Sequence, residues 1–194
     1  MIVGVTGGMG CGKSTAAKGF ESHGFRRVDA DAQIRELILT APAVLAELRS
    51  RYGAAVFTVD GEIDRTALAA RIFAEVAERR WLEQLTHPLL FAEWRRLLAT
   101  PLEADWVFEV PLLFEQSLEN WFDFTVCVAC SLPLQLVRLE QRGLSRELAG
   151  QRISQQLPLA RKIELADRVM WNDGSAAFLQ VQIDTFVASL PGRR

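Results

Sequence analysis

A run of glycines near the start of the chain matches the pattern G-x-x-x-x-G-K-[ST], which wraps the phosphates of a nucleotide. Its members are Gly7, Gly8, Met9, Gly10, Cys11, Gly12, Lys13 and Ser14. Glycine backbones can turn their N–H groups toward an anion, Lys13 can reach the β- and γ-phosphates, and the Ser14 hydroxyl can ligate Mg²⁺. The N–H group of Thr15 adds a donor. The pattern predicts a nucleoside triphosphate site and leaves the acceptor of the γ-phosphate open.

Two carboxylates, Asp29 and Asp31, follow a second predicted strand. In an extended segment, side chains at positions i and i+2 point the same way. One carboxylate can accept a hydroxyl proton, while the other can orient the acceptor or bind Mg²⁺ through water. An alternative is that one aspartate only caps the following helix. Because two carboxylates would repel a phosphate acceptor, the pair favours an alcohol acceptor.

Three arginines, Arg138, Arg142 and Arg146, are spaced four residues apart. On a helix, like charges at this spacing disfavour each other by about 0.2–0.5 kcal/mol. An anion that binds among them would explain the row, and Gly143 offers a hinge for a lid that closes over ATP. The alternative is a solvated helix face.

Other classes of nucleotide-binding protein fit the sequence poorly. A GTPase should carry a guanine-binding motif of the N-K-x-D type, and a transporter ATPase should carry an LSGGQ-like signature. The sequence contains neither motif. We therefore favour a small-molecule kinase. Two alternatives stay open, namely a kinase for another alcohol and a nucleotide-dependent switch that phosphorylates no small molecule.

The order of elements predicts a parallel α/β sheet, because a strand, a glycine loop, a helix and a second strand follow one another. The predicted strands are Ile2–Val5, Phe25–Val28, Trp106–Val110, Phe124–Ala129 and Arg168–Met170. The predicted helices of this core are Ser14–Phe20, Pro133–Gln141, Arg146–Gln156 and Ser175–Leu190.

The middle of the chain, from about residue 32 to 98, has a helical pattern and predicts a helical insert beside the sheet. Residues 52–65 interrupt it with glycines and aspartates, which predicts a turn or a small hairpin. Pro88 stands where a helix can begin, and we expect one to start there.

Composition bounds the class of protein. The chain has 194 residues, 49% of them hydrophobic and 24% charged, with a net charge of -2. These values predict an ordered globular domain and argue against a protein that coats nucleic acid. We also expect no membrane span, no signal peptide and, from three cysteines without framework spacing, a cytoplasmic location. Cys127 and Cys130 are expected in the core. No oligomeric state is predicted.

Taken together, the motifs resemble the dephospho-CoA kinase family from residue 1 to about 174. The resemblance rests on the glycine loop with Thr6 and Thr15, Asp29-Ala30-Asp31, Asp64-Arg65, His87-Pro88, Pro111-Leu112-Leu113-Phe114-Glu115, Gln155-Gln156, Ala166-Asp167 and Asn172. It implies ATP-dependent phosphorylation of the ribose 3′-hydroxyl of dephospho-CoA, the last step of coenzyme A synthesis, with ATP and Mg²⁺ as cofactors.

The family's architecture implies one domain, 1–194, in three parts: a parallel-sheet P-loop kinase core with helices on both faces, a helical substrate-binding insert and a small lid. The core would comprise 1–31, 104–137 and 162–194, the CoA-binding region about 32–103, and the lid about 138–161.

The resemblance also assigns roles by position. Asp31 resembles the general base and Asp29 its partner, Arg65 and His87 look like acceptor-site residues, Arg138 and Arg142 like lid arginines, and Asn172 like part of the adenine-side loop.

Two positions depart from the family's usual residues. Glu109 stands where many members have aspartate; it can hold Mg²⁺ through water, or it can be a surface acid at a strand end. Cys11 stands where serine is frequent, and we hypothesise that thiol modification there affects ATP binding.

Overall fold

The fold is described from a computed structural model, which covers residues 1–99 and 104–192. The chain forms two compact units. The first, here called the sheet unit, comprises Met1–Asp29 and Leu102–Arg194. The second, the helical unit, comprises Ala30–Pro101. Two predicted limits fall on positions outside the described residues. They are the end of the CoA-binding region at 103 and the end of the core at 193–194.

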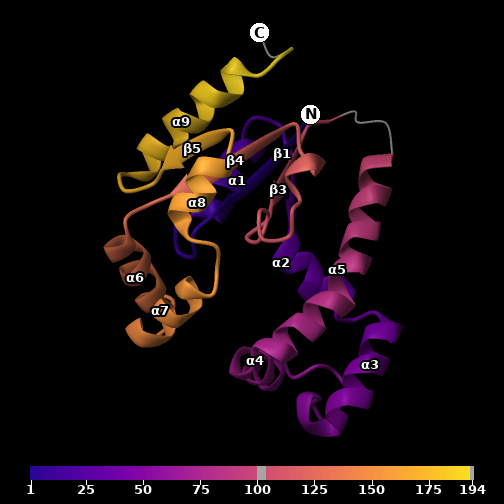
Figure 1. Cartoon of the computed structure of the whole chain (residues 1–194). Coiled ribbons are helices and arrows are strands. Elements are labelled where there is room, and N and C mark those ends of the chain that lie inside the picture. Colours follow the sequence, from indigo (N-terminus) through magenta and orange to yellow (C-terminus); the bar gives the residue numbers. More distant parts are fainter. Residues whose placement is uncertain (100–103, 193–194) are drawn as a thin grey trace. The chain divides into compact units, whose positions relative to one another are not determined.

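A parallel sheet forms the centre of the sheet unit (Figure 1). Within the described residues its strands are β1 (Ile2–Gly7), β2 (Arg26–Asp29), β3 (Trp106–Glu109), β4 (Phe124–Ala129) and β5 (Arg168–Trp171), in the order β2-β3-β1-β4-β5. Neighbouring strands all pair in parallel, as the sequence predicts. The central strands β1 and β4 are largely apolar, with one threonine each, because both faces of such a sheet are covered. β2 runs one residue further than predicted, because Asp29 pairs in register with Glu109.

Helices cover both faces of this sheet. On one face, α1 (Lys13–Glu21) and α9 (Ala176–Ser189) pack with Val3 and Val5 in one apolar cluster. On the other, the Thr6 hydroxyl donates to the Pro111 carbonyl, which also accepts from Lys162 of α8 (Leu159–Leu165). Successive side chains of a strand point to opposite faces. The predicted two-faced α/β core is therefore confirmed.

Two short helices, α6 (Leu132–Glu140) and α7 (Arg146–Ser154), follow β4. Gly143 lies between them with φ +85°, a left-handed conformation that glycine adopts without strain. Ser145 caps α7 by accepting a hydrogen bond from the Leu148 N–H. The predicted interruption is confirmed, whereas α8 was missed by the sequence prediction.

The helical unit contains α2 (Ala30–Gln33), a π-helical turn (Ile34–Ile38), α3 (Pro42–Tyr52), a 3₁₀ turn (Gly53–Val56), α4 (Arg65–Ala74) and α5 (Val76–Ala99). Helices dominate it, as the pattern predicts. An antiparallel bridge between Phe57 and Ile63 confirms the small hairpin.

One helix prediction in this unit is wrong. Pro88 does not begin a helix; it lies inside the 24-residue helix α5. A proline removes one backbone hydrogen bond. The helix continues because buried side chains on both sides of the proline, among them Leu82, Leu90 and Trp94, anchor its two halves, and the Thr86 hydroxyl donates to the Leu82 carbonyl.

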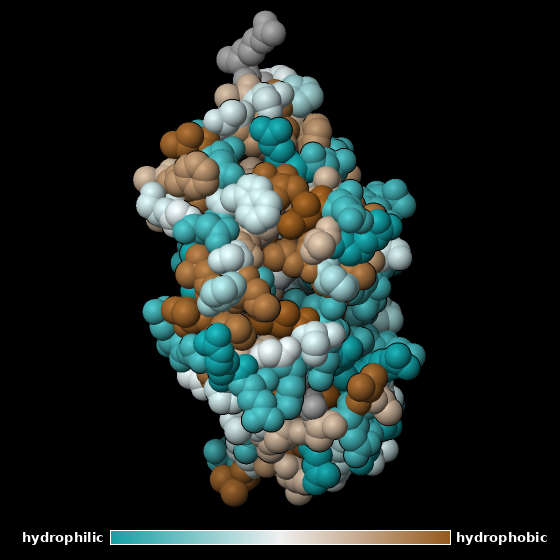
Figure 2. Space-filling model, turned by 60° about the vertical axis from the view of Figure 1, so that its left-hand side comes forward, coloured by the Kyte–Doolittle hydropathy of each residue, from teal (hydrophilic) through white to brown (hydrophobic). Residues whose placement is uncertain are grey.

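The surface mixes polar and apolar side chains. Figure 2 shows one face of the molecule, on which brown apolar residues are interspersed with teal polar ones. Exposed large apolar side chains of the sheet unit include Trp171, Phe178 and Val181. Among the helices of the described residues, none combines the length and apolar character that crossing a bilayer requires.

Candidate functional site

The glycine loop connects β1 to α1 and forms a cradle for an anion. Gly12, immediately before α1, has φ +95°, and a Cβ there would lie 2.2 Å from Asn172 Nδ2. Only glycine fits this position. In the described residues no side chain caps the N-terminus of α1, and its first turn holds no acid. The N–H groups of the loop and of this turn therefore suit a phosphate.

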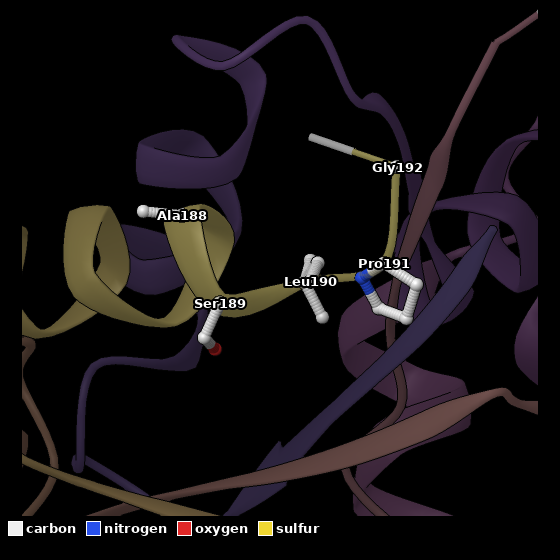
Figure 3. Close-up of a pocket in the computed structure, with 5 residues that line it drawn as sticks. All are labelled: Ala188, Ser189, Leu190, Pro191 and Gly192. Atoms are coloured by element: carbon white, nitrogen blue, oxygen red, sulfur yellow. The ribbon is translucent and has the colours of Figure 1, made fainter. Parts of the chain in front are cut away.

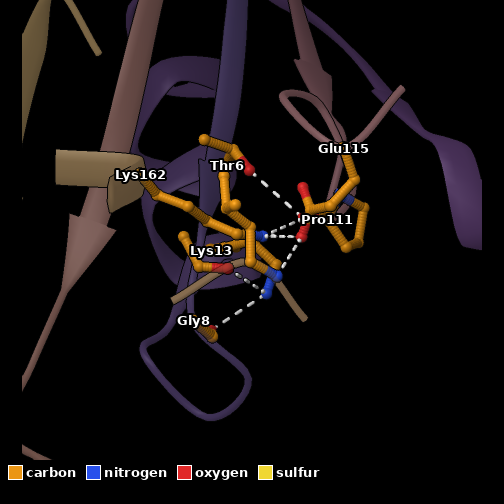
Figure 4. Close-up of polar contacts among 8 residues, drawn as sticks. Thr6, Gly8, Lys13, Pro111, Glu115 and Lys162 are labelled. Atoms are coloured by element: carbon orange, nitrogen blue, oxygen red, sulfur yellow. Dashed lines mark hydrogen bonds and ion pairs between the residues drawn. The ribbon is translucent and has the colours of Figure 1, made fainter. Parts of the chain in front are cut away.

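Lys13 folds back over the loop that precedes it (Figure 4). Its Nζ donates to the carbonyls of Gly8, at 3.1 Å, and Gly7, at 3.4 Å. The first distance is ordinary for an N–H···O hydrogen bond, and the second is long. A phosphate oxygen carries more charge than a carbonyl and can replace these acceptors. The cradle thus has a cation where the motif predicts one.

A chain of polar contacts joins the loop to the carboxyl ends of β2 and β3. The Ser14 hydroxyl donates to Glu109 Oε1 at 2.5 Å. The other oxygen of Glu109 accepts from Arg27 Nη2 at 2.7 Å, and the same nitrogen lies 3.1 Å from Asp29 Oδ2. Glu109 is a buried acid, so the interpretation as a surface acid is wrong.

The charge of Arg27 is stabilised by its partners. Burial lowers the pKa of its guanidinium, but the hydrogen bond to Glu109 and the charges of Glu109 and Asp29 outweigh burial. The pKa of Arg27 is therefore raised, and two acids share one permanent cation.

Asn172 and Arg138 brace the loop from the side of β4 and β5. Asn172 Nδ2 donates to the Cys11 carbonyl at 2.8 Å. Arg138, on α6, donates to the Asn172 carbonyl at 2.9 Å and to the Gly10 carbonyl at 3.4 Å. Two predicted site residues far apart in the sequence are thus brought to the loop itself.

The predicted row of arginines does not lie on one helix. Arg138 belongs to α6, Arg142 follows the end of that helix and is exposed, and Arg146 begins α7. Arg146 lies 3.6 Å from Glu140, with 63% of its side chain exposed. The helical repulsion argument therefore does not apply, because the backbone turns at Gly143.

Three cysteines lie in the glycine loop and in and after β4. Cys11, Cys127 and Cys130 are buried, which confirms the core placement of the last two. The sulfur atoms of Cys11 and Cys130 are 3.5 Å apart. A hydrogen bond from Cys130 lowers the pKa of Cys11 to about 7 against the opposing effect of burial, whereas burial raises the pKa of Cys127 to about 12.

A second polar cluster, missed in the sequence, lies beside the loop (Figure 4). Lys162 is fully buried and donates to the Pro111 carbonyl at 2.7 Å and to Glu115 Oε1 at 2.8 Å. Glu115 also accepts from the Leu157 N–H, so it ties the end of the α7 segment to the loop after β3. Nothing in the sequence signals Lys162, since α8 itself was not predicted.

Arg27 was also missed, although a signal existed. It stands two residues before Asp29 in the same strand, so both side chains lie on one face.

The helical unit carries the remaining predicted residues. Asp31 is exposed in the first turn of α2, Arg65 is the first residue of α4, after the cap Asp64, and the half-buried His87 of α5 stacks near Phe91 with ring centroids 5.7 Å apart. The strand spacing from which Asp29 and Asp31 were expected to point the same way does not hold, because the strand ends at Asp29 and a helix begins at Ala30.

A pocket at the end of α9 is unsuited to this chemistry (Figure 3). Its lining residues are Ala188, Ser189, Leu190, Pro191 and Gly192. None of these five side chains is charged, so the pocket offers no cation for a phosphate.

Known proteins resemble the chain over nearly its whole length. The sequence profile of the dephospho-CoA kinase family matches residues 1–177. The dephospho-CoA kinase of Thermosynechococcus vestitus is 40% identical over 193 residues, which cover 98% of this chain and 95% of the relative. That of Synechococcus elongatus is 42% identical over 186 residues, covering 94% and 88%.

Solved structures show the same likeness. A crystal structure from Thermus thermophilus superimposes with a TM-score of 0.83 at 33% identity, covering 99% of this chain and 98% of that one. Dephospho-CoA kinase from Campylobacter jejuni gives 0.67 at 26% identity, covering 96% and 94%. A shikimate kinase from Acinetobacter baumannii, at 15% identity, gives 0.55 over 96% and 90%, which is a likeness of fold alone.

Proposed function

The chain belongs to the dephospho-CoA kinase family, and from that membership we propose how its residues transfer the γ-phosphate of ATP to the ribose 3′-hydroxyl of dephospho-CoA. It is an ATP-dependent transferase of coenzyme A biosynthesis, and its family membership does not favour the alternatives of another kinase or a switch. The observation that carries the mechanism is the glycine cradle between β1 and α1, with Lys13 folded over it.

The cradle binds the triphosphate of ATP in this proposal. The N–H groups from Gly10 to Thr15 face the phosphates, and Lys13 exchanges its carbonyl contacts for β- and γ-phosphate oxygens. Arg138 holds the loop through its carbonyl contacts and adds positive charge beside the transferring group. Arg142, exposed beyond α6, contacts the phosphates from the lid.

Asn172 supports the nucleotide from the end of β5. Its side-chain amide is engaged with the Cys11 carbonyl, so it acts by fixing the loop beside the adenine rather than by reading the base.

Mg²⁺ fits the oxygen donors at the carboxyl end of β3. Ser14 supplies a hydroxyl and Glu109 a buried carboxylate, and oxygen ligands of this kind are the ones that Mg²⁺ takes. We propose that Ser14 ligates the ion and that Glu109 holds it through water. When bound, the ion neutralises charge on the β- and γ-phosphates.

The acceptor is activated by a carboxylate of the chain. Asp31 accepts the proton of the 3′-hydroxyl as that oxygen attacks the γ-phosphorus, and Asp29 supports the acceptor or the metal through water. The helical unit contributes Arg65 and His87 to the binding of dephospho-CoA. Closure of the lid excludes water, which otherwise would take the phosphoryl group.

A cytoplasmic location belongs to the same proposal. It is supported by the three cysteines, which are buried as free thiols.

An acceptor panel tests the function. ADP release is measured with dephospho-CoA, adenosine, shikimate and gluconate at equal concentration, with Mg²⁺ and ATP in excess. Dephospho-CoA should be the preferred acceptor, and its product should lose phosphate to a 3′-nucleotidase. Lys13→Ala is the control for contaminating kinases. Turnover of another alcohol with none of dephospho-CoA would contradict the assignment.

A further inference from the structure

We propose that Arg27 is a positioning residue, which fixes the Glu109 carboxylate against the Ser14 hydroxyl and thereby sets how tightly a divalent cation is held with the nucleotide. This inference rests on the proposed metal-binding role of Ser14 and Glu109. It concerns a residue that contacts neither the phosphates nor the acceptor in the mechanism above.

The sheet places Arg27 between two acids. Its Nη2 lies 2.7 Å from Glu109 Oε2 and 3.1 Å from Asp29 Oδ2. β2 and β3 pair in parallel with Asp29 opposite Glu109. Arg27 precedes Asp29 by two residues and shares its face of the sheet. One guanidinium nitrogen therefore bridges carboxylates that come from neighbouring strands.

The two oxygens of Glu109 have different partners. Oε2 accepts from Arg27, while Oε1 accepts from the Ser14 hydroxyl at 2.5 Å. Rotation of the carboxylate would disturb both bonds, and its side chain is only 8% exposed. Because Ser14 donates its proton to Glu109, the lone pairs of its oxygen stay available to a cation. Arg27 thus acts on the cation ligand through Glu109.

Loss of Arg27 would release this arrangement. Asp29 and Glu109 would then be two anions in register with no guanidinium between them, and their repulsion would turn Glu109 away from its present position. The Ser14 hydroxyl would lose its fixed acceptor. A partner that orients a metal ligand is typically worth 10- to 100-fold in metal affinity.

The test measures cation binding without any acceptor. Mn²⁺ is titrated into the full-length protein saturated with ADP and followed by electron paramagnetic resonance, for the wild type and Arg27→Met. We expect Mn²⁺ affinity to fall about tenfold, with the affinity for ADP alone unchanged. Arg26→Met is the matched control, because it removes the same charge from the residue before Arg27. The side chain of Arg26 lies on the opposite face of the sheet, beside Trp106. Arg26→Met should leave Mn²⁺ binding unchanged.

A double-mutant cycle tests the route through Glu109. In a Glu109→Gln background, Arg27→Met should change Mn²⁺ affinity by less than about twofold, since the group it positions is gone. Unchanged or tighter binding in the single variant, or the same tenfold loss in the Gln background, would overturn the proposal.

Two further measurements keep the result interpretable. If circular dichroism shows that Arg27→Met does not fold, Arg27→Lys and the double variant Arg27→Lys/Glu109→Gln replace it. The effect of Arg27→Lys on Mn²⁺ affinity must then again be smaller in the Glu109→Gln background. Wild-type protein with ADP that binds no Mn²⁺ would refute the proposed metal site itself. Wild-type binding that Arg27 does not influence would refute only this inference.

Discussion

Substitution of Gly12 by alanine tests whether the loop is held in a shape that only glycine permits. Gly12 has φ +95°, where a residue with a Cβ is strained by about 1–2 kcal/mol. The new Cβ would lie 2.2 Å from Asn172 Nδ2, so the amide must move and its bond to the Cys11 carbonyl is lost. Leaving a buried carbonyl unpaired costs about 1–3 kcal/mol.

The two effects together predict that Gly12→Ala lowers the free energy of unfolding by about 2–5 kcal/mol. Two matched variants separate them. Gly24 also has positive φ, at +83°, but nothing lies within 4 Å of an added Cβ, so Gly24→Ala reports backbone strain alone. Gly150 is helical with open space around it, and Gly150→Ala should stabilise by about 0.5–1 kcal/mol.

The assay is urea denaturation without nucleotide, followed by calorimetric titration with ATP. From most to least stable, we expect the order Gly150→Ala, wild type, Gly24→Ala and Gly12→Ala. Only Gly12→Ala should lose ATP affinity, by about tenfold or more, which corresponds to about 1.4 kcal/mol or more of binding free energy. The reasoning is refuted if Gly12→Ala is no less stable than Gly24→Ala and binds ATP as the wild type does.

Three other predictions concern buried or reactive side chains. Lys162→Met should lower the free energy of unfolding by about 3–5 kcal/mol, because Glu115 is left without its cation. Urea denaturation measures this loss. A Lys162→Met/Glu115→Leu variant that is no more stable than the single variant would contradict the reasoning. Asp31→Asn should reduce turnover about 10²–10⁴-fold with ATP affinity unchanged, as expected of a general base. Single-turnover kinetics measures the first effect and calorimetry the second. Normal turnover in this variant would show that Asp31 is not the base. Cys11 is buried, so an alkylating reagent reaches its thiol only when the loop opens. Since the pKa of Cys11 is lowered to about 7 and the thiolate is the reactive form, this alkylation should accelerate as pH rises from 6 to 8 and slow with ATP bound. Peptide mass spectrometry follows the rate, and a Cys130→Ala variant with the same pH profile would exclude the sulfur contact as the cause.

Several expectations drawn from local spacing failed. Pro88 is a poor residue inside a helix, yet side chains buried on either side hold α5 together. Arg138 and Arg142 have helical spacing, yet the helix ends between them at Glu140. Asp31 follows Asp29 at strand spacing, yet α2 begins at Ala30. In each case the prediction came from spacing over a few residues, and spacing alone does not say where a helix or strand begins and ends.

The sequence by itself determined the glycine cradle, the parallel α/β sheet and the family, because these depend on short runs of residues whose backbone preferences are local. Only the tertiary structure decided which side chains meet at the end of the strands. Ser14 and Glu109 are 95 residues apart and Arg27 and Glu109 are 82 residues apart. Such pairs form because β2, β3 and the start of α1 become neighbours only when the apolar faces of the sheet are buried, and no local propensity encodes that arrangement.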